Sequence, residues 1–198
     1  TRRTPGRFRT RVLTEGVTPS LHLDYKHCRI KQYHKEGQAL RTETTINETR
    51  DFALGKRLRN LAALRQVGFS ANRRLLDVQR LSHDCALGET TLTEVQRPQV
   101  VGAQRVPALR VTDPRVQALF SALVVFRLLP HGFAAPEFRQ HVAPLLGVPP
   151  AALTPGRLTY DLRRLRLHGL IARTPKTHRY HVTPFGFRLA LFVTRVHA

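Results

Sequence analysis

The sequence lacks methionine and tryptophan, and only 13 of its 198 residues are acidic. The two cysteines, Cys28 and Cys85, lie far apart and form no CxxC pair, so neither a zinc ribbon nor a disulfide framework is predicted, and a reducing cytoplasm fits best. The longest apolar stretch, residues 118–126, is interrupted by Ser121 and falls well short of the roughly 20 residues that cross a bilayer. We therefore expect no membrane partner.

The motifs of several enzyme classes are also missing. The sequence contains no GxSxG, no phosphate loop of the GxxxxGK[ST] type and no paired-carboxylate site. No apolar signal segment is present, and the chain starts at Thr1 without any methionine, so we expect it to be part of a longer product. These absences favour a protein without catalysis of its own, and they predict no cofactor.

Cationic side chains, in contrast, are abundant. The chain holds 33 Lys and Arg, giving a formal charge of +20, and only five of them are lysines, which leaves 28 arginines. A GC-rich genome would explain the ratio of Arg to Lys but not the net charge. Arginine pairs with phosphates and base edges better than lysine does. Since a hydrophobic fraction of 41% is sufficient for packed cores, we expect a folded protein with a polyanionic partner.

The distribution of glycine and proline predicts an α+β chain with two domains. Residues 83–112 read as a connecting region, because Gly88, Pro98, Gly102 and Pro107 punctuate them. We therefore expect a basic α+β domain over 1–82, a linker over 83–112 and a second domain over 113–198. Residues 1–112 hold 21 cationic and 10 acidic side chains, a net of +11, and residues 113–198 hold 12 and 3, a net of +9.

The first half is predicted to form strands followed by helices. Residues 8–13 and 21–25 have strand patterns, and two β-favouring runs, 29–35 and 39–47, flank Glu36-Gly37 as in a hairpin. A two-residue loop there would pair Tyr33 with Leu40 and Ile30 with Glu43. From residue 50 to 82 the apolar spacing is helical, divided at Gly68.

The second half is predicted to follow the order helix, helix, helix, strand, strand, helix. Asp113-Pro114 is a good helix start, and a second helix is expected from about 136 to 146. The third begins after Thr154-Pro155-Gly156 and ends at Gly169. Residues 171–175 and 178–183 form a second hairpin pattern, and a final helix starts at Thr183-Pro184.

Two short patterns in this half carry a family resemblance. Leu165, Gly169, Leu170 and Ile171 match a Leu-x-x-x-Gly-Leu-Ile step, and a Tyr-x-Val-Thr-x-x-Gly pattern follows at 180–186. Together with the element order, they make residues 113–198 resemble the winged helix-turn-helix superfamily of many bacterial regulators. The resemblance implies that the third helix is a recognition helix and that the hairpin after it is a wing.

The cations of the third helix suit that role. With Leu158, Leu162 and Leu165 turned inward, several polar residues lie on its other faces, where they could meet a B-DNA major groove. The candidate contacts on this helix are Arg157, Tyr160, Arg163, Arg164 and Arg166. Lys176, His178 and Arg179 lie at or near the tip of the wing, and the alternative for both sets is a solvated basic surface.

The first hairpin resembles the K-x-Y-x-K and R-x-E hairpin of some plasmid and phage replication initiators. The matching positions are Lys31, Tyr33, Lys35, Arg41 and Glu43. With Arg29, the cations on this hairpin would bind backbone charge, Tyr33 could stack on a base, and Glu43 could hold Arg41 or Lys31 in place. An ordinary charged hairpin with Tyr33 half-buried is the alternative.

Three further hypotheses remain open. His22 and Asp24, with His27 and His34 nearby, could bind a divalent ion that assists phosphodiester attack by water or by a tyrosine. That would make the chain the C-terminal part of a replication- or transposition-type nuclease, but we expect these histidines to bind no metal. The second is an RNA-binding scaffold. The third is a protein partner that docks on the apolar start of the last helix.

Overall fold

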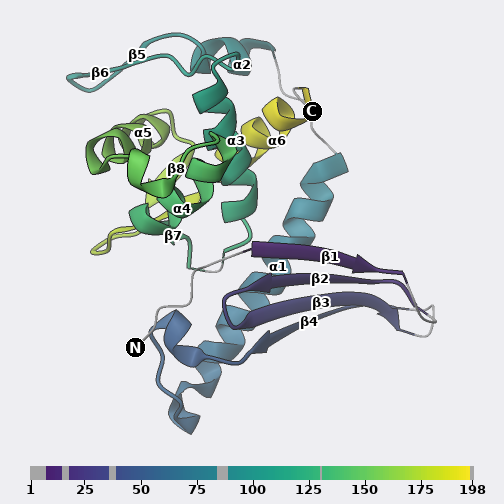
Figure 1. Cartoon of the computed structure of the whole chain (residues 1–198). Helices are drawn as coiled ribbons and strands as arrows, with labels where there is room; N and C mark the ends of the chain where they lie inside the picture. Colours follow the sequence, from purple (N-terminus) through teal and green to yellow (C-terminus); the bar gives the residue numbers. More distant parts are fainter. Residues whose placement is uncertain (1–7, 15–17, 36–38, 84–88, 130, 197–198) are drawn as a thin grey trace. The chain divides into compact units, whose positions relative to one another are not determined.

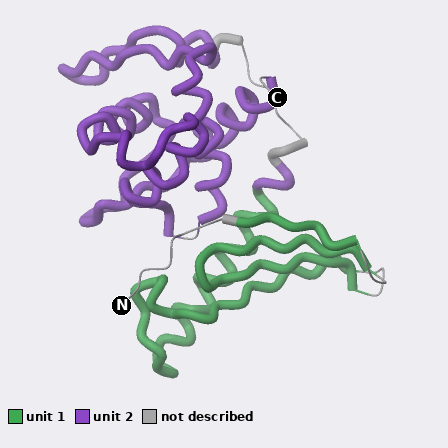
Figure 2. The backbone as a smooth tube through the Cα atoms, in the orientation of Figure 1, with its two compact units in different colours: residues 1–77 green, residues 78–198 purple. Residues whose placement is uncertain are grey.

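The computed structural model describes residues 8–14, 18–35, 39–83, 89–129 and 131–196. The chain divides into two compact units, residues 1–77 and residues 78–198 (Figure 2). The boundary therefore falls within a helix, whereas the sequence suggested a domain end at residue 82. None of the described helices is long and apolar enough to cross a membrane. As predicted, the fold class is α+β, with an antiparallel sheet first and a mainly helical part after it.

The first unit is built on a four-stranded antiparallel sheet (Figure 1). Its strands follow one another in the order β1 (Phe8–Leu13), β2 (Ser20–Tyr25), β3 (Cys28–Lys35) and β4 (Ala39–Ile46). β1 and β2 lie where the alternation of residue types predicted strands. Every neighbouring pair is joined by a short connection, as expected for antiparallel strands.

The register of the β3–β4 hairpin differs by one residue from the prediction. Tyr33 pairs with Arg41 rather than with Leu40, and Ile30 pairs with Thr44 rather than with Glu43. The physical reason is the length of the connection, because Lys35 pairs with Ala39 and three residues separate them instead of two. A one-residue shift changes which side chains share a face. Here it places Arg41 opposite Tyr33 and Glu43 opposite Lys31, with all four side chains on the same face.

One face of the sheet is covered by the helix α1 (Leu61–His83), which lies behind the strands in Figure 1. Buried apolar side chains come from both layers, and Thr44 donates a hydrogen bond to the Asn72 side chain at 2.6 Å. These apolar residues are Leu23, Ile30, Val67, Ala71 and Leu75. Helix α1 runs unbroken through Gly68, where a division was predicted, because the burial of Val67 before it and of Ala71 after it outweighs the low helix propensity of glycine. Before it, two 3-10 turns, η1 (Thr49–Phe52) and η2 (Leu58–Asn60), replace the expected start of the helix.

After the end of α1, the second unit continues with elements that the sequence pattern did not suggest. The segment predicted as a linker holds a helix, α2 (Glu89–Val95), and a small hairpin of β5 (Gln99–Val101) and β6 (Gln104–Val106). Val95, Val106 and Leu109 are buried there. Because these apolar residues pack into the second unit, residues 89–112 are part of it.

The rest of the second unit has the predicted helices and hairpin in the predicted order, and it adds a short strand before the second of these helices that the sequence pattern did not predict. The helices are α3 (Pro114–Phe126), α4 (Ala135–Leu145), α5 (Pro155–Leu167) and α6 (Pro184–Val196), with a 3-10 turn, η3 (Pro150–Ala152), before α5. The strands are β7 (Phe133–Ala134), β8 (Ile171–Arg173) and β9 (Arg179–Val182), in the sheet order β7-β9-β8. Asp113 caps α3 as predicted, since its carboxylate accepts the backbone N–H of Arg115 at 2.8 Å. Stacked Phe126, Phe133 and Phe138 lie in its core.

The Thr183-x-x-Gly186 step joins the hairpin to α6 through close backbone contacts. The Thr183 hydroxyl accepts the N–H of Gly186 at 2.9 Å and donates to the carbonyl of Gly169 at 2.8 Å. A Cβ on Gly186 would lie 2.0 Å from the carbonyl oxygen of Leu170. The glycine therefore allows α6 to pack directly on the chain that leaves α5.

Candidate nucleic-acid interface

Helix α5 presents a cationic surface to solvent. Its first turn is capped by Thr154, and Leu158, Leu162 and Leu165 bury the opposite side in the core. Four of the five residues predicted to contact DNA are exposed: Arg157, Tyr160, Arg163 and Arg166. We call these four residues the α5 face. Tyr160 is 46% exposed, which is enough for its ring to reach a partner.

A buried ion pair fixes α5 to α3. Asp161, the one acidic residue of α5, is 1% exposed and lies 2.5 Å from the guanidinium of Arg115. A second bond, from Arg115 Nε to the same carboxylate, measures 3.3 Å. A buried carboxylate needs such a partner, since an isolated charge in the core is costly. The pairing also removes the one negative charge of the helix from its exposed side.

The fifth predicted residue, Arg164, is engaged inside the unit. Its guanidinium donates hydrogen bonds to the backbone carbonyls of Pro107 and Ala108. Nearby, His168 Nε2 lies 2.9 Å from the Pro107 carbonyl, and Arg163 donates to the side chain of Gln104 at 3.2 Å. The segment that follows α2 thus lies along α5. Arg164 positions this segment, a role that the sequence pattern did not indicate.

His168 is buried in this contact. Burial lowers the pKa of the imidazole below its usual value, an effect larger than that of the bond to Pro107, which raises it. In the described structure its Nδ1 is buried without a hydrogen-bond partner. Because a second ring proton would be an unpaired buried donor there, the imidazole is held in the neutral form.

The hairpin of β8 and β9 carries two exposed cationic or titratable residues at its tip. Lys176 is exposed and adopts a left-handed backbone conformation, with φ of 56°. His178 is exposed, and its Nδ1 lies 3.2 Å from the guanidinium of Arg173. Arg173 also donates to the Thr177 carbonyl at 2.8 Å, which closes the tip.

Arg179 points back into the unit. Its guanidinium donates to the carbonyls of His131 and Gly132 at 2.9 and 2.8 Å and forms an ion pair with Glu137 at 3.1 Å. Glu137 also accepts the backbone N–H of Ala134 at 2.8 Å. Arg179 therefore ties the hairpin to the start of α4, and the exposed tip is formed by the residues before it.

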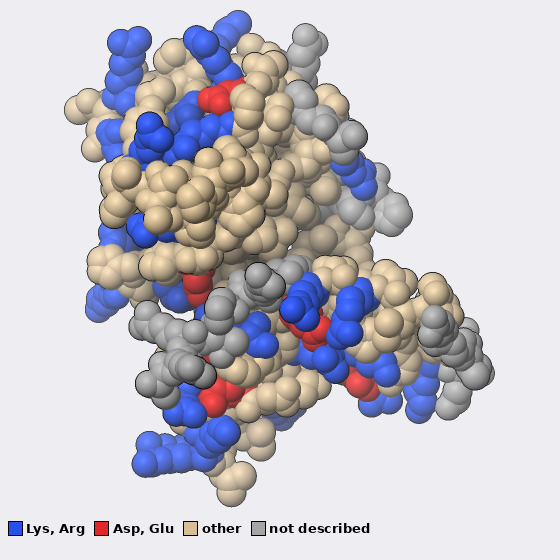
Figure 3. Space-filling view, in the orientation of Figure 1, with Lys and Arg blue, Asp and Glu red and all other residues tan. Residues whose placement is uncertain are grey.

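The first unit has a second cationic surface, on the sheet face opposite α1. Alternate residues of each strand share this side, and the register aligns them across the four strands. We call it the sheet face. Its described residues are Arg9, Arg11, Leu13, Ser20, His22, Asp24, Arg29, Lys31, Tyr33, Lys35, Ala39, Arg41, Glu43 and Thr45. Lys and Arg side chains gather over this sheet with a few carboxylates among them (Figure 3).

Asp24 holds two arginines of the sheet face from neighbouring strands. Its carboxylate lies 2.6 Å from the guanidinium of Arg29 and 2.8 Å from that of Arg11. The bond from Arg29, more than that from Arg11, holds the pKa of Asp24 below its usual value. Both guanidinium groups remain about half exposed, so their other N–H groups stay available to solvent.

Glu43 organises a second cluster on the same face. It forms an ion pair with Arg41 at 2.7 Å and accepts the hydroxyl of Tyr33 at 3.1 Å. The ammonium of Lys31 lies over the Tyr33 ring, 4.6 Å from its centroid. The expectation that Glu43 holds Arg41 in place is met by this contact. Tyr33 is half-buried, and Lys35, at the end of β3, is exposed.

His22 lies between Arg11 and Lys31 in the cross-strand register. It is 9% exposed, its Nε2 lies 3.0 Å from the Ser20 hydroxyl, and its Nδ1 is buried without a partner in the described structure. Burial, followed by the charge of Lys31, lowers the pKa of this histidine. The imidazole at the centre of the sheet face is therefore harder to protonate than a free histidine.

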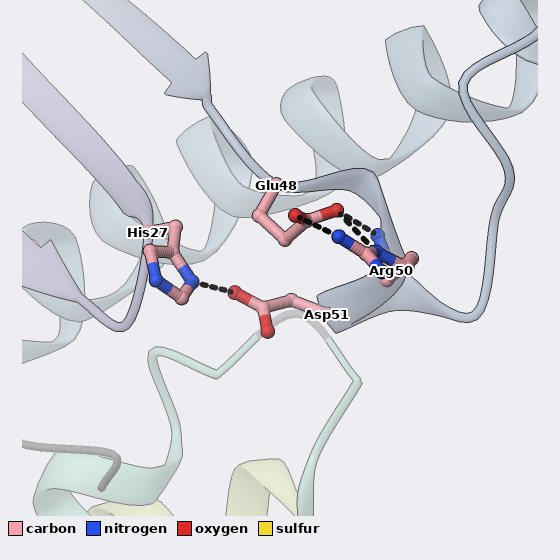
Figure 4. A network of polar contacts seen from close by, with 4 residues as sticks. All are labelled: His27, Glu48, Arg50 and Asp51. Atoms are coloured by element: carbon pink, nitrogen blue, oxygen red, sulfur yellow. Dashed lines mark hydrogen bonds and ion pairs between the residues drawn. The ribbon is translucent and has the colours of Figure 1, made fainter. Parts of the chain in front are cut away.

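The four residues weighed as metal ligands are not brought together. His22 and Asp24 share the sheet face, as predicted, but His34 is on the opposite side of β3 and His27 pairs with Asp51 at 3.1 Å. Figure 4 shows this pair beside the ion pair of Glu48 and Arg50. Among the described residues, no group of three or more His, Cys, Asp or Glu could hold a metal ion.

The polar groups around this turn also offer no activated nucleophile. Burial raises the pKa of the Cys28 thiol to about 12, which keeps it protonated. Hydrogen bonds from Arg50 lower the pKa of Glu48 to about 2, which keeps that carboxylate ionised. Cys85 lies outside the described residues.

Comparisons of the chain with protein-family models, curated proteins and solved structures found no match. The assignment of the interface residues therefore depends on the geometry of this structure. The sequence interpretation missed Arg9, Arg11 and Asp24 as part of one surface with the β3–β4 hairpin. The alternation along β1 and β2 could have indicated them, because residues two apart share a face.

Proposed function

We propose that the protein binds duplex DNA without catalysis of its own, with α5 in the major groove. The observation that carries the proposal is the α5 face, which combines three exposed arginines with Tyr160 and has no exposed acidic residue. A B-DNA major groove about 12 Å wide admits one α-helix. Arginine there can bond guanine O6 and N7 or flanking phosphates, and tyrosine can bond phosphate.

The hairpin after α5 acts as the wing in this proposal. Lys176 and His178 at its tip contact the phosphate backbone beside the groove. Arg164 and Arg179 hold the helix and the wing in position, since their guanidinium groups are bonded to backbone carbonyls of the same unit. The resemblance of residues 113–198 to the winged helix-turn-helix superfamily supports the same assignment.

DNA is favoured over RNA as the partner because of the shape of the recognition element. The major groove of A-form RNA is deep and narrow, so side chains of a helix cannot read it. Whether binding is specific for a base sequence or general depends on how many of the α5 arginines reach base edges. A DNA-binding role accords with a cytoplasmic location, which we include in the proposal.

Neutralising the α5 face tests the proposal. The triple variant R157Q/R163Q/R166Q should bind a labelled duplex about 100-fold more weakly, because three contacts of about 1 kcal/mol each amount to two orders of magnitude. The matched control R59Q/R65Q/R73Q removes the same charge from exposed residues of η2 and α1. It should weaken binding by less than about threefold, the effect of long-range charge alone.

Equal affinities of the two triple variants, measured by fluorescence anisotropy, would contradict the placement of the interface on α5. Structured RNA as a competitor distinguishes the RNA-binding alternative, which requires that RNA displaces the duplex at lower concentration than unlabelled DNA does. Incubating the protein with supercoiled plasmid and Mg²⁺ or Mn²⁺ tests the nuclease alternative. Nicking activity that co-purifies with the protein would contradict the proposal that it has no catalysis of its own.

A further inference from the structure

We propose that the sheet face of the first unit is a second, independent surface for duplex DNA, which it holds by the phosphate backbone. The inference rests on the proposed function only in naming DNA as the duplex. Its surface belongs to a different compact unit from α5, and none of its residues takes part in the α5 face.

The charge of the sheet face is strongly one-sided. Its described residues include six cationic side chains, Arg9, Arg11, Arg29, Lys31, Lys35 and Arg41, against two carboxylates. The opposite side of the same sheet is covered by α1 and contributes Leu23 and Ile30 to the core. A sheet that is solvated on one face needs polar residues there, but it does not need this excess of one sign. The excess complements a polyanion.

The two carboxylates of the face orient its arginines rather than neutralising all of them. Asp24 fixes Arg11 and Arg29 from the strand between them, and Glu43 fixes Arg41. A guanidinium has five N–H donors, so one or two bonds to a carboxylate leave the rest for a ligand. Because the forks are already held in place, less side-chain entropy is lost when a phosphate binds.

The composition of the face favours a duplex over a single strand. Single-stranded nucleic acids are held largely by bases that stack on aromatic rings. Tyr33 is the one aromatic residue of the sheet face as defined above, and its ring is covered by Lys31 while its hydroxyl is bonded to Glu43. Among its described residues, the face therefore offers several charged donors to phosphates but a single aromatic ring, which already contacts Lys31 and Glu43.

The width of the face also fits a duplex. The four strands span three spacings of about 4.8 Å, which is about 14 Å from β1 to β4. The major groove is about 12 Å wide. Arginines on β1 and on β4 are thus about as far apart as the phosphate backbones that border one groove, whereas one strand of nucleic acid would meet only one row of them.

The test is the salt dependence of duplex binding by the full chain. Each phosphate contact contributes about 0.9 to the slope of log affinity against log salt concentration. The variant R11Q/R29Q/R41Q should make that slope less steep by about 2 to 3 and should weaken binding at low salt. The control R59Q/R65Q/R73Q should change the slope by less than about 1. Circular dichroism and thermal unfolding of each variant check that the sheet is intact.

A second variant keeps the test valid if loss of the Asp24 and Glu43 contacts unfolds the sheet. R9Q/K35Q changes two exposed residues at the margins of the face and should lower the slope by about 1 to 2. The inference would be overturned if both sheet-face variants showed the same salt dependence of binding as the control variant. It would also be overturned by variants that lose binding to single-stranded DNA, structured RNA or acidic lipid vesicles but bind duplex DNA normally.

The same variants distinguish this inference from the proposed function. If R157Q/R163Q/R166Q binds like the wild type while R11Q/R29Q/R41Q is impaired, the role of α5 is wrong and the sheet face stands. If the reverse holds, the sheet face is wrong and α5 stands. Combining the two triple variants should reduce binding further than either does alone, because independent sites contribute additively.

Discussion

At the scale of single residues, arginine has two distinct roles in the second unit. Arg163 and Arg166 are exposed on α5, whereas Arg164 between them bonds two backbone carbonyls of the same unit. Arg179 on the hairpin is similarly bonded to the chain before β7. The sequence could not distinguish these roles, because they depend on segments far away along the chain. Surface charge on α5 is therefore smaller than the count of its arginines implies.

His168 makes folding stability depend on pH. Burial lowers its pKa in the folded state, so between the folded and the unfolded pKa the unfolded chain binds more protons and folding is penalised. Above about pH 6.5 the folded state carries no such penalty. As the pH falls below this value, the free energy of unfolding decreases by up to about 1.4 kcal/mol for each unit by which the folded pKa lies below the unfolded pKa. The free energy of unfolding in urea should therefore fall between pH 7.5 and 5.5.

The variant H168Q isolates this contribution. Glutamine can still donate to the Pro107 carbonyl, which His168 Nε2 contacts at 2.9 Å, but it does not titrate. Its unfolding free energy should decline less steeply over this pH range than that of the wild type. Other titratable groups are common to both proteins, including the half-buried His141, whose pKa is also lowered by partial burial. Parallel pH profiles would show that His168 does not carry the effect.

At the scale of elements, the predicted helices of the second unit were correct because their signals are local. Asp113-Pro114 and Thr154-Pro155 mark helix starts, and apolar residues recur at helical spacing between them and the next glycine. Non-local features were missed. The β3–β4 register depends on a loop one residue longer than assumed, and α1 continues through Gly68 because residues before and after it are buried against the sheet.

In the candidate site, too, the sequence predicted the local features but not the non-local ones. The four residues of the α5 face could be predicted from one helix alone. The contacts of Asp24 with Arg11 and Arg29 join three strands, so they required the sheet topology as well as the sequence.

The junction between β9 and α6 yields a stability prediction. Alanine at Gly186 would place its Cβ 2.0 Å from the Leu170 carbonyl, so G186A should destabilise the chain by about 1 to 3 kcal/mol through overpacking. G156A is the matched control, because a Cβ there meets nothing within 4 Å and alanine favours a helix. Its stability should be unchanged or slightly higher. Urea unfolding measures both, and equal stability of the two variants would contradict the close contact.

At the scale of the whole molecule, the charge of +20 is divided between two units that differ in architecture. Each unit has a cationic surface of its own, one on a helix and one on a sheet. Asp161 of α5, and Asp24 and Glu43 of the sheet face, are bonded to arginines. Under the two proposals, the chain contacts DNA phosphates through both surfaces rather than through one. Affinity should then fall steeply with salt.

The most direct test of the central claim is a photo-crosslink from the middle of α5. Tyr160→p-benzoylphenylalanine places a photoreactive group on the α5 face, and Phe69→p-benzoylphenylalanine, at a 53% exposed position of α1, is the control. Irradiation with a labelled duplex should give a protein–DNA adduct from position 160 and none from position 69. Bound DNA without an adduct at 160, or with equal adducts at both positions, would contradict the claim that α5 lies against DNA.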